Sequence, residues 1–238
     1  MFVTGDTHGK TDWGKIFDAK REGKVGKDEH LIIAGDFGGI WYGTGRDNEL
    51  LDRYAKLPFN ILFIDGNHEN FDALNAYPIT VWNGGKVHKI RENVIHLMRG
   101  QVFTIDSKTI FTMGGGQSID KAWRLNYEKE KNNSLKRGKR PIKIWWEQEM
   151  PTTEEIEEAR ANLAKAHYTV DYIITHTNSN LFMKNYLGFE KENNVLTHFL
   201  DEVFQRVTYE WWHCGHFHMD QDYKEIGVSV LYDRIIKL

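Results

Sequence analysis

Residues 31–39 read Leu-Ile-Ile-Ala-Gly-Asp-Phe-Gly-Gly. Four apolar residues in succession, closed by a glycine, predict a buried strand of an α/β sheet. The carboxylate of Asp36 follows this strand at its carboxyl end, where open α/β sheets place their ligands. The two glycines then turn the chain away. This segment therefore predicts an interior strand with a polar group at its functional end.

The same design occurs on both sides of this segment. Residues 1–6 read Met-Phe-Val-Thr-Gly-Asp, and residues 61–68 read Ile-Leu-Phe-Ile-Asp-Gly-Asn-His. Asp6, Asp36 and Asn67 are separated by roughly 30 residues each, about the length of one βαβ unit. Since the strands of such units run parallel, we expect the three polar side chains at one edge of the sheet.

The composition is that of a soluble globular protein. Of the 238 residues, 40% are hydrophobic and 27% are charged, and the net charge of −3 gives no global attraction to nucleic acid or membranes. The only cysteine, Cys214, excludes a disulfide framework and favours a reducing compartment. No apolar run approaches the roughly 18 residues of a membrane span. Met1 leads directly into the first strand, so we expect no signal peptide and a cytoplasmic protein.

Beyond residue 77 the sequence predicts short strands in mixed or antiparallel pairing. They cover residues 94–98, 101–106 and 108–113. Residues 121–150 are strongly charged and predict a solvated surface insertion. Because neither an internal repeat nor a linker is evident, we expect a single domain over residues 1–238.

Two strands in the second half end in histidine. Residues 170–175 predict a strand that ends at His176, and a capping box at Thr152 opens the helix before it. Residues 208–214 predict a strand that ends at Gly215-His216-Phe217-His218. These histidines join the polar residues that follow the first three strands.

The predicted strand ends together carry a set of metal-binding side chains. They are Asp6, His8, Asp36, Asn67, His68, His176, His216 and His218. Mixed oxygen and imidazole ligands suit Mn²⁺, Fe²⁺ or Zn²⁺ better than Ca²⁺, which prefers oxygen throughout. The set is too large for one ion. Two metals that share a carboxylate, about 3.5–4 Å apart, are the natural arrangement.

The same residues resemble the calcineurin-like metallophosphoesterase pattern. Its five blocks D-x-H, G-D, G-N-H-D/E, H and G-H-x-H are matched in family order by Asp6-Thr7-His8, Gly35-Asp36, Gly66-Asn67-His68-Glu69, His176 and Gly215-His216-Phe217-His218. The blocks span residues 5 to 218. The resemblance implies an α/β fold, a two-sheet β-sandwich of mixed strands flanked by helices, with a metal pair at one edge.

The resemblance also implies a role for each site residue. The first metal would be held by Asp6, His8, Asp36 and His218, and the second by Asp36, Asn67, His176 and His216. Asp36 would be the shared ligand. His68 would bind no metal but would stand near the leaving-group oxygen. We expect manganese, with iron, zinc, nickel or cobalt as alternatives that these ligands also tolerate.

These roles predict hydrolysis of a phosphoester. A water between two dications loses a proton near neutral pH and attacks phosphorus, while His68 donates a proton to the departing alkoxide. We expect a phosphomonoesterase that acts on small molecules or phosphoproteins. A phosphodiesterase or nuclease could use the same metals, with nucleic-acid binding supported only by the basic run 136–140. A non-catalytic scaffold is less consistent with a complete ligand set.

The residues after Asp36 bear on the substrate. In protein phosphatases of this superfamily the Gly-Asp block continues as V-D-R-G, which supplies a phosphate-binding arginine. Here it continues Phe37-Gly38-Gly39-Ile40, and the next basic residue is Arg46. Arg124 follows a glycine-rich loop and is our candidate for the phosphate; the alternative is an ion pair on the acidic surface. The order Gly-Gly-x-Ser-x-Asp, then Arg, then Trp-Trp-x-x-Glu in this region resembles small bacterial and phage-type members of the superfamily. The natural substrate and the oligomeric state stay open.

Overall fold

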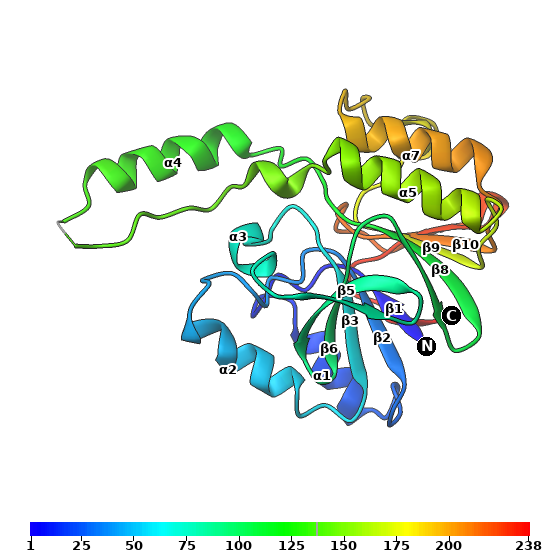
Figure 1. Cartoon of the computed structure of the whole chain (residues 1–238), viewed down its shortest axis with the longest axis horizontal. Helices are drawn as coiled ribbons and strands as arrows, with labels where there is room; N and C mark the ends of the chain where they lie inside the picture. The colour runs from blue at the N-terminus through cyan, green and yellow to red at the C-terminus, as the bar shows by residue number, and fades with distance from the viewer. Residues whose placement is uncertain (137) are drawn as a thin grey trace.

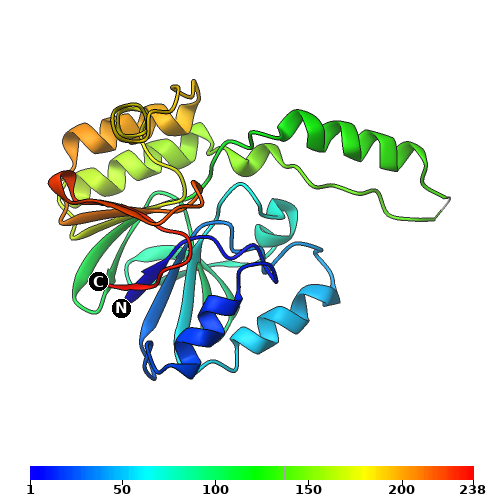
Figure 2. The same ribbon diagram turned by 180° about the vertical axis from the view of Figure 1, so that it is seen from behind.

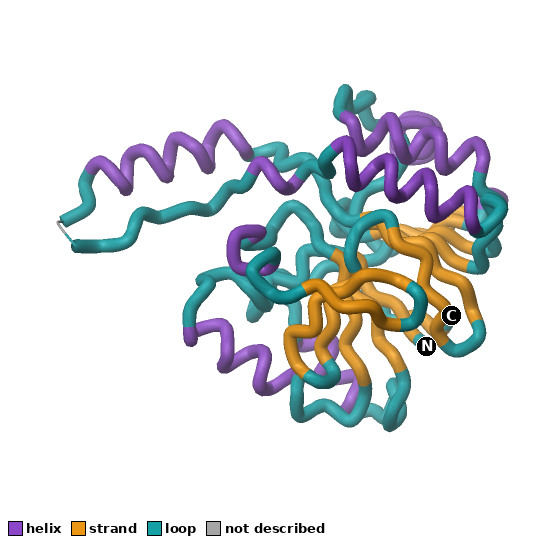
Figure 3. The backbone as a smooth tube through the Cα atoms, in the orientation of Figure 1, coloured by secondary structure: helices purple, strands orange, loops and turns teal. Residues whose placement is uncertain are grey.

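The protein, described for residues 1–136 and 138–238 by a computed structural model, is built from two β-sheets packed between helices (Figures 1 and 3). The first sheet has seven strands in the order β13-β1-β2-β3-β6-β5-β4, and the second has six in the order β11-β12-β10-β9-β8-β7. The first sheet comprises β1 (Phe2–Thr4), β2 (His30–Ala34), β3 (Asn60–Ile64), β4 (Ile79–Trp82), β5 (Gly85–Arg91), β6 (Val94–Leu97) and β13 (Ile236–Lys237). The second comprises β7 (Gln101–Ile105), β8 (Lys108–Met113), β9 (Tyr172–Thr175), β10 (Trp211–Cys214), β11 (Gln221–Tyr223) and β12 (Val228–Val230).

The helices flank the two sheets, and one of them extends away from both (Figures 1 and 2). They are α1 (Gly14–Arg21), α2 (Gly45–Tyr54), α3 (Phe71–Leu74), α4 (Lys121–Asn133), α5 (Thr153–Lys165), α6 (Asn180–Phe182) and α7 (Val195–Arg206), with the short turns η1 (Glu147–Glu149), η2 (Met183–Leu187) and η3 (Lys224–Ile226). Helices α1 and α2 pack on the first sheet, and α5 and α7 lie side by side on the second. None of the helices in the described part of the chain is long and apolar enough to span a bilayer.

The packing of β2 on both faces explains why the apolar run 31–34 contains no polar residue. Leu31 and Ile33 pack into the cluster beneath α1 and α2, whereas Ile32 and Ala34 pack into the core between the two sheets. All four are fully buried. Since each buried Leu or Ile side chain stabilises the fold by about 1.5–3 kcal/mol, alternation with polar residues would be costly here.

Strand direction brings the two sheets' carboxyl ends to one edge. β1, β2 and β3 pair in parallel, and so do β8, β9 and β10 in the second sheet. The predicted two-sheet α/β architecture with mixed strands is confirmed. The predicted capping box is also present, with the Thr152 hydroxyl accepting from Glu155 N and the Glu155 carboxylate accepting from Thr152 N.

Some elements were missed because their sequences lack a periodic apolar face. The hairpin β4–β5 lies at a sheet edge, where Ile79 and Val81 are 58% and 78% exposed. Helix α4 buries only Arg124, so it has no apolar stripe to signal a helix. Helix α2 begins at Gly45, earlier than its apolar residues indicate, because the Thr44 side chain caps it.

The predicted insertion forms an arm, which we define as residues 119–146 without Arg137. Arg137 belongs to the basic run 136–140 and lies outside the described residues. Helix α4 and the returning chain extend away from the sheets side by side (Figures 1 and 2). Side chains of α4 hold the return chain: Arg124 donates to Ile144 O, and Asn132 exchanges two hydrogen bonds with Ile142. The arm is therefore a paired structure, with Arg124 at its inner end.

A buried polar cluster lies behind the end of β3. Asp65 accepts two hydrogen bonds from Arg99, at 2.8 and 2.6 Å, and faces His96 Nε2 at 3.1 Å. His96 Nδ1 lies 3.1 Å from His88 Nδ1, so one ring nitrogen must be unprotonated. Burial and the adjacent His96 lower the pKa of His88 to about 4.

This shift makes stability depend on pH. Between about pH 6.5 and pH 4 the unfolded chain binds a proton at His88 that the folded chain does not, so the free energy of unfolding falls as the pH falls. In His88→Gln, which cannot titrate, we expect this slope to flatten by up to about 1.4 kcal/mol per pH unit. Urea unfolding at pH 7, 6 and 5 measures it, with the exposed His198→Gln as control. An unchanged slope in His88→Gln would contradict the assignment.

Candidate metal centre

The predicted ligands follow five strands that end at the edge shared by the two sheets. Asp6, Asp36 and Asn67 come after β1, β2 and β3, and His176 comes directly after β9. His216 and His218 follow β10, which is parallel to β9. The topology thus assembles residues that are distant in sequence.

Hydrogen bonds between the loops fix their relative positions. The backbone N–H groups of Thr7 and His8 both donate to Asp36 O, at 3.2 and 2.8 Å. The Glu69 carboxylate is buried and accepts from Phe37 N at 2.7 Å. The loops after β1 and β3 are therefore both tied to the loop that carries Asp36.

Two motif glycines allow this close packing. A Cβ at Gly35 would lie 2.1 Å from His176 Nδ1, and a Cβ at Gly66 would lie 2.1 Å from Asp36 Oδ1. Neither distance is sterically possible, so any side chain at these positions would push a ligand out of place. The glycines in the Gly-Asp and Gly-Asn-His blocks are thus required by the neighbouring strand.

The ligand backbone is conformationally unusual. Ten non-glycine residues of the described chain have positive φ, and four of these are predicted ligands: His8, Asp36, His216 and His218. Such conformations are uncommon outside glycine and cluster at functional sites, where the surrounding structure maintains them. The left-handed turns direct these side chains toward the shared edge.

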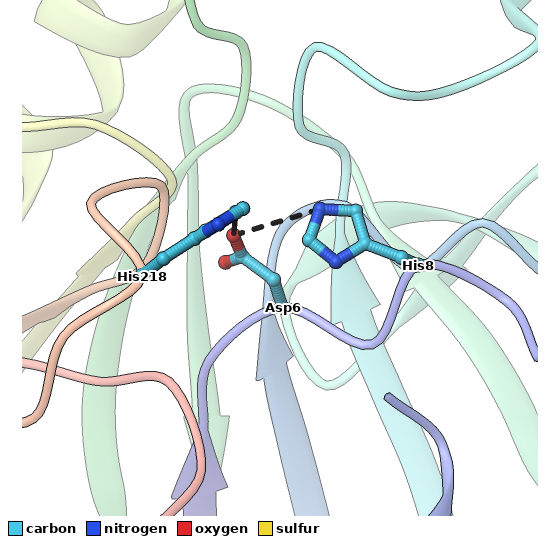
Figure 4. Close-up of side chains that lie close together, drawn as sticks. All are labelled: Asp6, His8 and His218. Carbon is cyan, nitrogen blue, oxygen red and sulfur yellow. Dashed lines mark ion pairs between the residues drawn. The ribbon is translucent and has the colours of Figure 1, made fainter. Parts of the chain in front are cut away.

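Asp6 lies between two imidazoles (Figure 4). Its Oδ2 is 3.2 Å from His218 Nε2 and 4.0 Å from His8 Nε2. That oxygen is fully buried and makes no hydrogen bond within the described residues. A buried carboxylate oxygen without a donor costs free energy unless a cation compensates it. These three side chains could therefore hold one metal ion.

A second group forms around Asp36 and His176. Asp36 Oδ1 is 3.4 Å from His176 Nε2, which also lies 3.0 Å from Asn67 Oδ1. His176 Nδ1 donates to Ala34 O at 3.0 Å, and this fixes Nε2 as the nitrogen that faces the carboxylates. Asp6, Asp36 and His176 are close enough to hold a further ion. Asp36 Oδ2 is also 3.2 Å from His8 Nε2, so Asp36 touches both groups.

The histidines differ in their electrostatic setting. Burial opposes the charge on His176, but Asp36 and Asp6 outweigh it and raise its pKa to about 10. Burial and the adjacent His176 lower the pKa of His216 to about 4, which keeps that imidazole in the neutral form that binds metals. The ring centroids of these two histidines are 4.9 Å apart. Without metal, His176 thus carries the positive charge that balances the buried carboxylates.

The residues present fit a metal pair. The structure brings all seven predicted ligands to one edge, with an unsatisfied carboxylate oxygen and oriented imidazoles among them. One positioning contact was missed by the sequence analysis: Asp12 Oδ2 lies 2.7 Å from His8 Nδ1 and thereby directs Nε2 toward Asp36. The spacing of four residues between His8 and Asp12 could have revealed it.

His68 and Arg124 meet beside this centre. His68 N donates to Asp36 Oδ1 at 2.7 Å, and its ring centroid is 5.5 Å from that of His8. Arg124 Nη2 lies 3.0 and 2.8 Å from the two His68 ring nitrogens. Burial lowers the pKa of His68, and Arg124 adds to this effect against the opposing charge of Asp36. Arg124 is only 4% exposed, although it comes from the arm.

An open cavity of about 800 Å³ adjoins these groups. It begins at His8, His68 and His218 and continues past Gly38 and Gly39 toward Trp41 and Arg46. The cavity is of the size that holds small ligands. A molecule much larger than phosphate can therefore reach the edge where the ligands converge.

Comparisons with known proteins place the chain in a family. The sequence model of the family described as calcineurin-like phosphoesterase matches residues 1–220. A solved structure similar to this chain is that of a Staphylococcus aureus protein assigned as a 5′-nucleotidase, in complex with alpha-ketoglutarate. The two share 14% identity with a TM-score of 0.42, over 97% of this chain and 47% of that one. This chain thus spans about half the length of that protein. No curated protein matches the chain.

Metal binding should stabilise the folded protein measurably. At a Mn²⁺ concentration 100-fold above the dissociation constant, we expect a gain of about 2.7 kcal/mol per site over protein treated with EDTA. Thermal unfolding with and without Mn²⁺ measures this gain. Asp36→Asn should remove most of it, because Asp36 touches both groups. The exposed Asp52→Asn is the control and should retain it. An Asp36→Asn protein with the full Mn²⁺ shift would exclude Asp36 as the shared ligand.

Proposed function

Because the chain belongs to the calcineurin-like phosphoesterase family, we propose that it is a phosphomonoesterase that works with two divalent metal ions. The first ion would be held by Asp6, His8, Asp36 and His218, and the second by Asp36, Asn67, His176 and His216. We propose manganese as the native metal; these oxygen and imidazole ligands also suit iron, zinc, nickel and cobalt. When bound, such a pair lowers the pKa of water and neutralises charge on the phosphoryl group.

Arg124 is the observation that carries the monoester proposal. A monoester presents phosphoryl oxygens that no second ester group blocks, and a guanidinium binds two of them in parallel. Arg124 Nη2 reaches the His68 ring, while Nε pairs with Asp120 at 2.8 Å and Nη1 donates to Ile144 O at 3.1 Å. These two contacts hold the guanidinium beside the His68 ring. In protein phosphatases the arginine comes from the Gly-Asp block; here the arm would supply it.

His68 would act as the general acid. Its backbone is tied to Asp36, and its ring lines the cavity where a leaving group would depart. Arg124 can donate only to an unprotonated ring nitrogen, so its present contact favours neutral His68. A bound phosphate would draw the guanidinium away from the ring. His68 could then carry a proton toward the leaving oxygen.

The cavity would receive the leaving group. It extends from His68 past Gly38 and Gly39, and Trp41 and Tyr42 form part of its wall. A small-molecule phosphomonoester of moderate size fits this volume, and a phosphorylated side chain of a protein fits its open end.

Paired substrates distinguish this proposal from the main alternative, a phosphodiesterase or nuclease. With Mn²⁺, we expect turnover of 4-nitrophenyl phosphate to exceed that of bis(4-nitrophenyl) phosphate at least tenfold in kcat/KM. Both reactions release the same coloured product, so leaving-group chemistry is matched. Asp36→Asn controls for contaminating phosphatases. A strong preference for the diester would reject the monoester assignment and favour the alternative.

Replacement of His68 tests the general acid. In His68→Ala we expect kcat to fall about 10²–10⁴-fold for an alkyl phosphate, whose leaving group needs a proton. The fall should be much smaller for 4-nitrophenyl phosphate, whose leaving group is stable as an anion. Metal content should match the wild type. Equal losses on both substrates would remove His68 from this role.

A further inference from the structure

Glu149 is a buried carboxylate that the proposed reaction does not use. It lies at the end of η1 and is 2% exposed. Its Oε1 accepts from Ser118 N at 3.2 Å, and its Oε2 accepts from the Ser118 hydroxyl at 2.5 Å. Ser118 Oγ in turn lies 3.2 Å from Asn67 Nδ2. A continuous hydrogen-bond chain therefore connects Glu149 to a predicted metal ligand.

The donor and acceptor chemistry of these groups allows only one order of donation along the hydrogen-bond chain. A carboxylate only accepts hydrogen bonds, so the hydroxyl proton of Ser118 must point to Glu149. The Ser118 oxygen can then only accept from Asn67, which must present its NH₂ group. The opposite end of the amide, Oδ1, consequently faces His176 Nε2 at 3.0 Å. Only Oδ1 can bind a cation, because the NH₂ group has no lone pair for it.

We infer that Glu149, acting through Ser118, sets the orientation of the Asn67 amide, so that Oδ1 and not Nδ2 is offered to the metal. Glu149 and Ser118 are positioning residues in this inference, which rests on the proposed dinuclear centre. An amide is nearly symmetric in shape. Steric packing therefore discriminates poorly between its two orientations, whereas the hydrogen-bond chain distinguishes them fully.

The backbone holds Glu149 in place for this task. Gly116 N donates to Glu149 O at 3.2 Å, and Arg99 Nη2 donates to Gln148 O at 2.8 Å. Arg99 is itself anchored by Asp65, which precedes the Asn67 loop. Ser118 and Glu149 also stand on either side of the arm in sequence. The same pair thus closes the base of the arm and orients the ligand.

An isosteric substitution at Glu149 should reverse the direction of donation along the hydrogen-bond chain. In Glu149→Gln, the carboxamide oxygen would accept from the fixed donor Ser118 N, which turns the carboxamide NH₂ group toward the Ser118 hydroxyl. Ser118 Oγ would then accept from that NH₂ group and donate its own proton to Asn67. The Asn67 amide would turn over and present Nδ2 to the metal. The substitution keeps size and shape, so it changes only the charge and the hydrogen-bond polarity of the side chain.

Mn²⁺ titration calorimetry on metal-free protein tests the inference without any substrate. We expect wild-type protein to bind two ions. Glu149→Gln should lose about 10–100-fold in affinity at one site, the range seen when partners of metal ligands are removed, with the other site within a few-fold of wild type. Ser118→Ala, in which the amide is merely released, should lose less. Glu155→Gln changes a nearby carboxylate that is not part of this hydrogen-bond chain, and it serves as the matched control.

The double variant Ser118→Ala/Glu149→Gln tests whether Glu149 acts on Asn67 through Ser118. If Glu149 acts through Ser118, the double variant should bind as Ser118→Ala does, whereas independent roles would make the two losses add. Wild-type affinity in Glu149→Gln, additive losses, or equal weakening at both sites would each overturn the inference. If Glu149→Gln does not fold, Ser118→Ala decides alone, and unchanged affinity overturns it. Wild-type protein that binds no Mn²⁺ would overturn the proposed function as well.

Discussion

Two carboxylates, Asp6 and Asp36, are buried together where the sheets meet, at 0% and 1% exposure. Charges of the same sign in such a place repel each other and have lost their hydration, so compensation by positive charge is obligatory. In the metal-free protein His176 supplies part of it, as its raised pKa indicates. Much of the surrounding architecture follows from this constraint.

The parallel strands meet this need for compensating charge because they place the proposed ligands at one edge in nearly fixed positions. Each ligand follows a buried strand, and the left-handed turns and close-packed glycines leave few alternative positions. Apolar burial along β2 supplies the stability that holds these strained turns in place. The centre is consequently specified by the core, and a core substitution beneath β2 would move metal ligands as well as lower stability.

The sequence was sufficient for this part of the molecule because the relevant signals are local. An apolar run, a glycine and a polar residue sit within nine positions around Asp36, and the same order recurs around Asp6 and Asn67. The hairpin β4–β5 and helix α4 could not be predicted in this way. The residues of β4 and α4 are largely exposed. Tertiary contacts such as that of Ile144 N with the Glu128 carboxylate, rather than periodic burial, hold α4.

Long-range polar contacts could likewise not be predicted from the sequence. Ser118 and Glu149 belong to the Gly-Gly-x-Ser-x-Asp and Trp-Trp-x-x-Glu patterns, but the patterns alone do not show that the two side chains meet. Arg124 could be proposed as a phosphate ligand, but its contact with His68 depends on how the arm folds back. Resemblance to a family suggested the proposed metal ligands. It did not show which other side chains contact them.

The arm lies beside two of the residues that the family motifs supply. One end presents Arg124 to His68, and its base joins Ser118 to Glu149 beside Asn67. The arm thus contacts His68 directly, and the Ser118–Glu149 pair at its base contacts Asn67, a proposed metal ligand. In the proposed function the sheets supply the metal ligands, while the arm would influence which phosphoester is held there and the pair at its base would align one ligand. Substrate preference should accordingly respond to the inner end of the arm more than to any residue of the sheets.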